Sequence, residues 1–200
     1  MMSRLSSTLA ALAVFFALCA PAGAYDPEAT FHRNGFVLSA EGAYGWQVNV
    51  ESRPNFSGLE FWDVGVRFGW LPFETIGKGT PLYGALEVGL EPLYQRYVEP
   101  DQRFWAGLSA VVRYHFLSLG RFVPYIEAAG SAGGTDLELP EIRSTFAFLI
   151  FAGVGASIFV TDGAAVYAGY RFEHVSNGNT SHPNRGFESS VAVVGVSFFP

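Results

Sequence analysis

Apolar residues recur at every second position along most of the chain after residue 24, and this alternation limits what the chain can fold into. In the segment Trp62–Trp70, the even-numbered positions are all Trp, Val or Phe, whereas the odd-numbered positions are Asp, Gly and Arg. Successive side chains of a β-strand point to opposite faces, so a period of two predicts strands with one apolar and one polar face. We therefore expect an all-β fold that requires no helical segment.

Eight segments carry this pattern, and residues that favour turns separate them. The breaks contain Gly, Pro, Asn and Asp, for example in Ser52–Asn55 and Thr161–Gly163. Most segments are far longer than the ~5–6 residues typical of a strand in a soluble sheet. The expected strands are 36–50, 57–71, 81–97, 102–117, 122–134, 143–160, 164–176 and 187–199.

Two kinds of sheet protein explain such strands: a soluble sandwich, which buries its apolar face, and a membrane barrel, which turns that face toward lipid. The strand length favours the barrel. The polar face carries charges of both signs, which suits a filled and paired interior; they include Glu41, Asp63, Arg67, Glu87, Arg113, Glu127, Arg171 and Glu173. Aromatic residues lie near segment ends, as in interfacial girdles, namely Trp62, Trp70, Tyr97, Phe104, Tyr114 and Phe116. We predict an eight-stranded antiparallel transmembrane outer-membrane β-barrel. In a barrel of this size, side chains are just sufficient to fill the interior.

One stretch also fits a membrane-spanning helix. Ser144–Thr161 contains no charged residue and is long enough to cross a bilayer. Its large apolar residues, among them Phe146, Phe148 and Ile150, nevertheless share one strand face. A single helix would also leave seven amphipathic strands without a barrel, so we interpret the stretch as a strand.

The first 24 residues have the pattern of a secretory signal peptide. A positive charge at Arg4 precedes an apolar run, and Ala22-Gly23-Ala24 forms a cleavage signal. This pattern predicts cleavage after Ala24 rather than an N-terminal membrane anchor, so residues 25–200 form the barrel in the cell outer membrane. The net charge of −6, without a cluster of Lys and Arg, argues against a nucleic-acid partner.

Two polar residues interrupt the apolar face of the segment 164–176. His174 and Ser176 take the last two places on the face expected to meet lipid, where burying polar groups in hydrocarbon is costly. Residues i and i+2 of a strand project from the same side, about 6.6 Å apart, so the imidazole can reach the hydroxyl. This is the base–nucleophile arrangement of acyl transfer. A periplasmic N-terminus would place this end of the strand, and the loop 177–186, outside the cell.

A third group is expected to orient the imidazole. If the last hairpin is symmetric about Ser181, residue 174 pairs with Glu188 on the same face, with Cβ atoms ~5 Å apart. Glu173 is the rival acid, but the alternation points it into the lumen. A metal site formed by His174, His182 and Glu188 lacks supporting ligand spacing.

The residues of this hairpin resemble a family signature. His174-Val175-Ser176-Asn177-Gly178, followed by Pro183-Asn184-Arg185-Gly186-Phe187-Glu188, is similar to the pattern H-x-S-N then N-x-G-x-E of the PagL-type lipid A 3-O-deacylase family. The resemblance implies an outer-membrane serine esterase that removes the 3-O-linked acyl chain from the lipid A of lipopolysaccharide, without a metal or cofactor. By motif position it implies that Ser176 is the nucleophile, His174 the base and Glu188 the orienting acid. It also implies oxyanion or positioning roles for Asn184, Asn177 and Gly178.

Other functions remain open at this point. A small barrel of this kind can be a non-catalytic structural or adhesive protein that works through its loops. The same triad can also serve a phospholipase or an acyltransferase. The sequence leaves open the acyl-chain length preference and the oligomeric state, including a homodimer. Of the other histidines, we expect His32 on the surface and His115 in the lumen.

Overall fold

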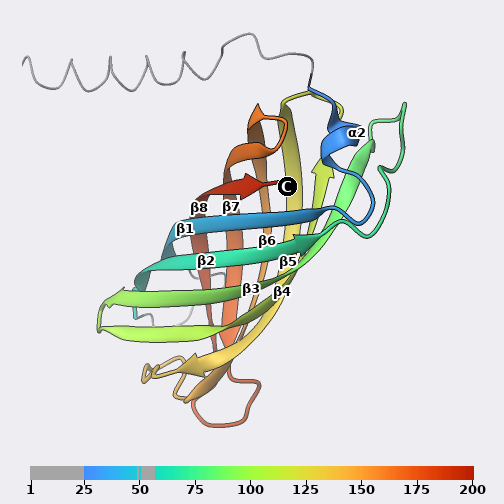
Figure 1. The fold of residues 1–200 in the computed structure, drawn as a ribbon. Helices are drawn as coiled ribbons and strands as arrows, with labels where there is room; N and C mark the ends of the chain where they lie inside the picture. Colours follow the sequence, from blue (N-terminus) through green and yellow to red (C-terminus); the bar gives the residue numbers. More distant parts are fainter. Residues whose placement is uncertain (1–24, 49, 51–56) are drawn as a thin grey trace, which may run out of the picture.

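The computed structural model describes residues 25–48, 50 and 57–200; the expected signal peptide at residues 1–24 lies outside this part of the chain. Eight antiparallel strands close into a barrel, as predicted, in which consecutive strands pair and β1 also pairs with β8 (Figure 1). The strands are β1 Phe36–Val48, β2 Glu60–Trp70, β3 Gly84–Glu99, β4 Arg103–Phe116, β5 Phe122–Thr135, β6 Phe146–Thr161, β7 Ala164–Ser176 and β8 Phe187–Phe198.

The strand bounds differ from the sequence prediction by up to three residues: β2 begins at Glu60 rather than at residue 57, and β3 runs from Gly84 to Glu99 rather than over 81–97. β6 begins at Phe146 rather than at residue 143, because Arg143 forms an isolated bridge with Glu138 and Ile142 forms one with Asn184. By contrast, β7 occupies the predicted range 164–176.

The alternation did not predict the one-turn helix α2, Pro27–Thr30, which precedes the first strand. Asp26 caps this helix, since its carboxylate accepts a hydrogen bond of 3.0 Å from the backbone N–H of Glu28. Within the described residues, no helix is long and apolar enough to span a membrane.

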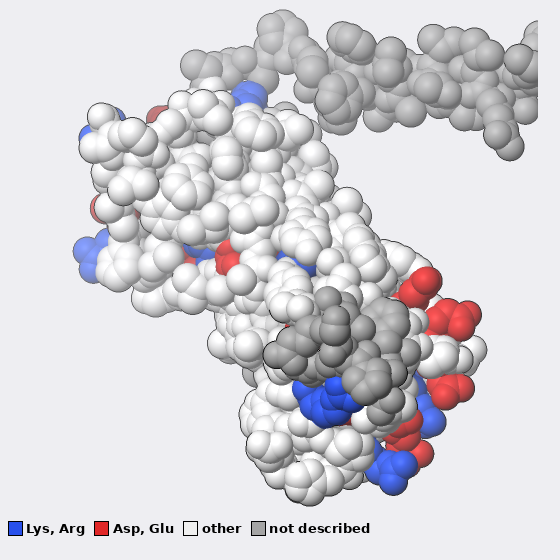
Figure 2. Space-filling model, turned by 180° about the vertical axis from the view of Figure 1, so that it is seen from behind, with Lys and Arg blue, Asp and Glu red and all other residues white. Residues whose placement is uncertain are grey.

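The two faces of the barrel wall have the predicted character. Outward side chains are apolar and exposed, such as Phe68 (62%) and Val194 (64%), whereas Arg67, one residue from Phe68, is only 1% exposed because it points inward. Figure 2 shows that charged side chains gather at the two ends of the molecule, with a mostly uncharged belt between them. Such a belt suits the hydrocarbon layer of a bilayer.

The interior is filled in three layers. A central layer of ion pairs surrounds Glu127, whose carboxylate lies 3.3 Å from Arg67, 2.8 Å from Arg113 and 2.7 Å from Arg171. An apolar cluster lies on either side of this layer; one includes Trp105 and Phe187, and the other includes Phe31, Leu117 and Phe159. The interior is therefore filled by side chains and contains ion pairs, as the sequence predicted.

Three aromatic or histidine positions can be compared with their predicted surroundings. Tyr97 was expected in an interfacial girdle, but it is fully buried inside the barrel, where its hydroxyl donates to Gln95 over 2.9 Å. It lies on the inward face of β3, so the girdle prediction was wrong for this residue. His115 lies in the lumen 2.8 Å from Glu87, and His32 is exposed, as predicted.

The two ends of the barrel differ (Figure 1). We call the end that carries α2 the helix end; it also includes the turns between β2 and β3, β4 and β5, and β6 and β7. We call the opposite end the loop end; it includes residues 57–59, 100–102, 136–145 and 177–186. Odd-numbered strands run toward the loop end, so β7 finishes there.

Candidate active site

The β7–β8 hairpin brings His174 and Glu188 together. His174 pairs directly with Glu188 in the ladder, as the symmetric hairpin predicts. Imidazole Nδ1 lies 3.3 Å from Glu188 Oε1, and the two side chains are 33% and 16% exposed. The rival acid Glu173 points into the lumen, where Gln95 Nε2 donates to its carboxylate over 2.9 Å. The predicted pairing is thus confirmed, and Glu188 is the acid that contacts the imidazole.

Ser176 lies on the same outward face at the last position of β7. It is half-buried beside Phe148, which is its Cα partner on β6. The hydrogen bonds between described residues include none from Ser176 to His174. The side chains are two residues apart on one face, and hydrogen bonds of this kind are often long before substrate binds.

The orientation of His174 leaves Nε2 for proton transfer, because Nδ1 faces Glu188. Gly186 lies against the ring. Its φ of +66° is in the left-handed region, and a Cβ there would lie 2.7 Å from the Val175 carbonyl oxygen, 2.9 Å from His174 Cε1 and 3.2 Å from Nε2. Gly186 therefore gives the imidazole its space. Gly186 is part of the hairpin motif, and extending the hairpin symmetry by two residues places it opposite Ser176.

The loop after Ser176 is held by asparagine side chains. Asn177 is fully buried, and its Nδ2 donates to the carbonyl and hydroxyl oxygens of Ser181 over 3.0 and 2.9 Å. The backbone N–H of Asn177 donates to Asn184 Oδ1 over 2.8 Å, and Asn184 Nδ2 donates to Asn179 Oδ1 over 3.0 Å. Both polar ends of the Asn184 side chain therefore bind loop atoms in this conformation.

Gly178 is the third predicted positioning residue. Its φ is +62°, and a Cβ there would lie 3.1 Å from the Phe148 ring. A side chain would be strained at this position by both the backbone and its neighbour. Gly178 thus allows the chain to turn tightly just after Ser176.

A second loop, residues 136–145, braces the first. The carbonyl of Glu141 accepts hydrogen bonds from the backbone N–H groups of Arg185 (2.7 Å) and Gly186 (3.2 Å). The Glu141 carboxylate is buried and accepts from the Ser57 hydroxyl over 2.6 Å and from Gln47 Nε2 over 3.1 Å. Sequence reasoning missed this brace, because its partners lie about 40 and 90 residues apart and no local pattern links them.

Comparison with known proteins gives both a family and a fold. The profile of a family described as "Lipid A 3-O-deacylase (PagL)" matches residues 41–197. A sequence search of curated proteins finds no match.

The solved structures that are similar to this barrel include the following two. The crystal structure of Neisserial surface protein A (NspA) has a TM-score of 0.60 and 16% identity, covering 82% of this chain and 96% of that one. The crystal structure of the outer membrane enzyme PagL has a TM-score of 0.58 and 20% identity, covering 80% of this chain and 97% of that one. Because both identities are low, these two similarities support the fold of this chain but do not assign its function.

Proposed function

Because the chain belongs to the lipid A 3-O-deacylase (PagL) family, we propose that it is an outer-membrane serine esterase that hydrolyses the 3-O-linked acyl ester of lipid A. The observation that carries this proposal is the His174–Glu188 contact of 3.3 Å on the outward face of the barrel, with Ser176 two residues along the same face. Base, orienting acid and hydroxyl nucleophile are the parts that acyl transfer needs.

The mechanism follows from this placement. His174 Nε2 takes the proton of the Ser176 hydroxyl as Oγ attacks the ester carbonyl. Glu188 accepts the Nδ1–H and stabilises the imidazolium that forms. The tetrahedral intermediate then breaks its bond to the sugar oxygen, which receives the proton from His174, and the acyl group remains on Ser176. Water, deprotonated by His174, attacks this acyl-enzyme and releases the fatty acid.

The oxyanion needs donors near the nucleophile. The N–H of Asn177 already binds Asn184 Oδ1, so Asn177 acts by shaping the loop. We assign the donor role to the N–H of Gly178 and to Nδ2 of Asn184, which would exchange Asn179 Oδ1 for the oxyanion. An exchange of this kind couples substrate binding to a small movement of loop 177–186.

The place of the site in the barrel favours a lipid ester as substrate. Ser176 and His174 continue the outward apolar stripe of β7, beyond Phe172 and toward the loop end. If the loop end faces outward, this position lies in the outer leaflet near the boundary between acyl chains and headgroups, where lipopolysaccharide carries its ester bonds. A soluble ester would not require a nucleophile on the lipid-facing surface.

The test is mass spectrometry of lipid A incubated with the refolded barrel of residues 25–200. We expect loss of one 3-hydroxyacyl chain, and a decrease in turnover of roughly 10⁴-fold or more for Ser176→Ala and for His174→Ala. Ser190→Ala is the matched control, because Ser190 lies on the same hairpin and its hydroxyl is 2.9 Å from Tyr170.

Three results would contradict the proposal. Near-normal turnover of Ser176→Ala would exclude the nucleophile. Acyl release from phospholipid but not from lipid A would favour a phospholipase. A folded barrel that is inactive on both lipids, but binds an envelope or host partner after Ser176 is replaced, would favour a structural or adhesive role.

A further inference from the structure

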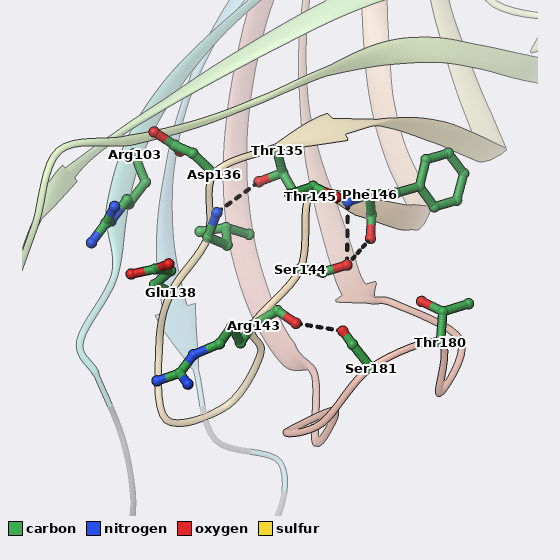
Figure 3. Close-up of a pocket in the computed structure, with 11 residues that line it drawn as sticks. Arg103, Thr135, Asp136, Glu138, Arg143, Ser144, Thr145, Phe146, Thr180 and Ser181 are labelled. Atoms are coloured by element: carbon green, nitrogen blue, oxygen red, sulfur yellow. Dashed lines mark hydrogen bonds between the residues drawn. The ribbon is translucent and has the colours of Figure 1, made fainter.

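A pocket of about 640 Å³ opens at the loop end, beside the loop that follows Ser176. Its walls come from the start of β4, from loop 136–145 and from loop 177–186 (Figure 3). The lining residues include Arg103, Glu138, Arg143, Ser144, Thr180 and Ser181. The volume is in the range of ordinary small-molecule sites, which run from ~300 to ~1,000 Å³.

The arginines of this pocket differ from those inside the barrel. Arg67, Arg113 and Arg171 each contact a buried carboxylate. Within the described part of the chain, neither Arg103 nor Arg143 forms an ion pair, and Arg103 Nε is buried without a hydrogen-bond acceptor. A guanidinium with open donor positions binds phosphate in a bidentate manner. Asp136 and Glu138 also line the pocket, so it offers both guanidinium and carboxylate groups to a ligand.

The other lining groups suit a saccharide. Figure 3 shows the charged ends of Arg103, Glu138 and Arg143 on one side of the view and the hydroxyls of Thr180 and Ser181 on the other. Glu138 is exposed and can accept hydrogen bonds from sugar hydroxyl groups. A mixture of guanidinium, carboxylate and hydroxyl groups matches a phosphorylated sugar better than it matches an acyl chain.

The pocket is connected to the nucleophile through β6 and through the loop that follows Ser176. Phe146 lines it, and Phe148, two residues further along the same face of β6, is the Cα partner of Ser176. Thr180 and Ser181 belong to the loop that follows Ser176. A headgroup in the pocket would therefore hold the ester bonds of the same lipid close to the catalytic hairpin.

We propose that this pocket binds the phosphorylated saccharide headgroup of the lipid substrate, with Arg103 and Arg143 on the phosphate and Glu138 on sugar hydroxyl groups. The inference rests on the proposed esterase function and adds to it the group that selects the substrate. Recognition lies in the polar headgroup, whereas cleavage takes place at the lipid-facing surface.

The test compares two substrates, lipid A and lipid A from which the phosphates have been removed enzymatically. For the wild-type barrel, we expect dephosphorylation to lower kcat/KM about tenfold, mainly through KM. For Arg103→Gln and Arg143→Gln, kcat/KM on phosphorylated lipid A falls by a similar factor, and dephosphorylation has much less further effect. Folding of each variant is checked by the heat-dependent shift of the barrel in gel electrophoresis.

Arg96→Gln is the matched control. Arg96 lies near the loop end of β3, points outward and donates to Gln102 over 2.8 Å, but it does not line the pocket. For Arg96→Gln, dephosphorylation of lipid A should lower kcat/KM by the same factor as for the wild type. The inference is overturned if the pocket variants respond to dephosphorylation as strongly as the wild type, or if Arg96→Gln loses as much as they do.

A direct binding measurement separates this inference from the esterase proposal. Titration of a monophosphorylated glucosamine lipid in detergent micelles measures affinity without catalysis. If Arg143→Gln binds this lipid more weakly than the wild type and the wild type does not hydrolyse lipid A, the proposal of headgroup binding stands and the esterase proposal is refuted. If the wild type hydrolyses lipid A and binds this lipid no more tightly than Arg143→Gln does, the esterase proposal stands and the proposal of headgroup binding in the pocket is refuted.

Discussion

Replacing Gly186 by alanine tests whether the position of the His174 ring limits the reaction. The added Cβ would lie 2.9 Å from His174 Cε1 and 2.7 Å from the Val175 carbonyl oxygen, both closer than real Cβ contacts come. The carbonyl belongs to the β7 ladder and has little freedom, so the imidazole or the loop has to move. A displacement of about 1 Å in a catalytic group lowers the rate about 10²-fold, which corresponds to about 2.7 kcal/mol in activation free energy.

Gly120→Ala is the matched control for this experiment. Gly120 has a φ of +63°, close to the +66° of Gly186, but a Cβ there would meet nothing within 4 Å. Both variants therefore carry the same left-handed backbone strain of about 1–2 kcal/mol, and only Gly186→Ala crowds the imidazole.

The assay is the initial rate of fatty-acid release from lipid A by folded barrels of equal concentration. We expect Gly120→Ala to stay within about twofold of the wild type and Gly186→Ala to lose about 10²-fold in kcat, with a smaller change in KM. Equal rates for the two variants would refute the reasoning, because steric contact with His174 would then have no kinetic effect.

Three further substitutions test the site and the interior. Glu188→Ala should lower kcat less than Ser176→Ala does, with a fold-loss smaller by about tenfold or more, since the orienting acid contributes less than the nucleophile. Equal losses in the two variants would contradict this order. Asn184→Ala should lower kcat about 10²-fold if its amide stabilises the oxyanion, and an effect on KM alone would exclude that role. Glu127→Ala should lower the free energy of unfolding in urea by about 3–5 kcal/mol, because three buried arginines lose a shared carboxylate; a change as small as that of the exposed Glu99→Ala would refute this.

The fold followed from the sequence because one physical rule acts along the whole chain. Lipid on one side and a crowded lumen on the other impose a period of two, so Arg67 and Phe68 could be assigned to opposite faces without a structure. The girdle prediction failed for Tyr97 because it relied on nearness to a strand end; the period of two places Tyr97 on the same inward face of β3 as Glu87, where it joins an interior apolar cluster.

The site was predicted as far as the hairpin geometry reaches. The His174–Glu188 pairing follows from symmetry about one loop residue, and the structure has that register. The brace from Glu141 and the pocket around Arg143 depend on contacts between two loops that are distant in sequence. Loop conformation is set by such long-range hydrogen bonds rather than by local periodicity, so no sequence pattern predicted the brace or the pocket.

The three layers inside the barrel bear on the permeability of the membrane that holds it. Apolar clusters lie on either side of a central layer of ion pairs, so a solute or ion passing through the described interior would have to cross two apolar zones. A cell could insert many copies of this protein without weakening the barrier that its outer membrane provides. The rigid core would serve as a scaffold, and the exchange with lipid would take place on the outer surface of the wall.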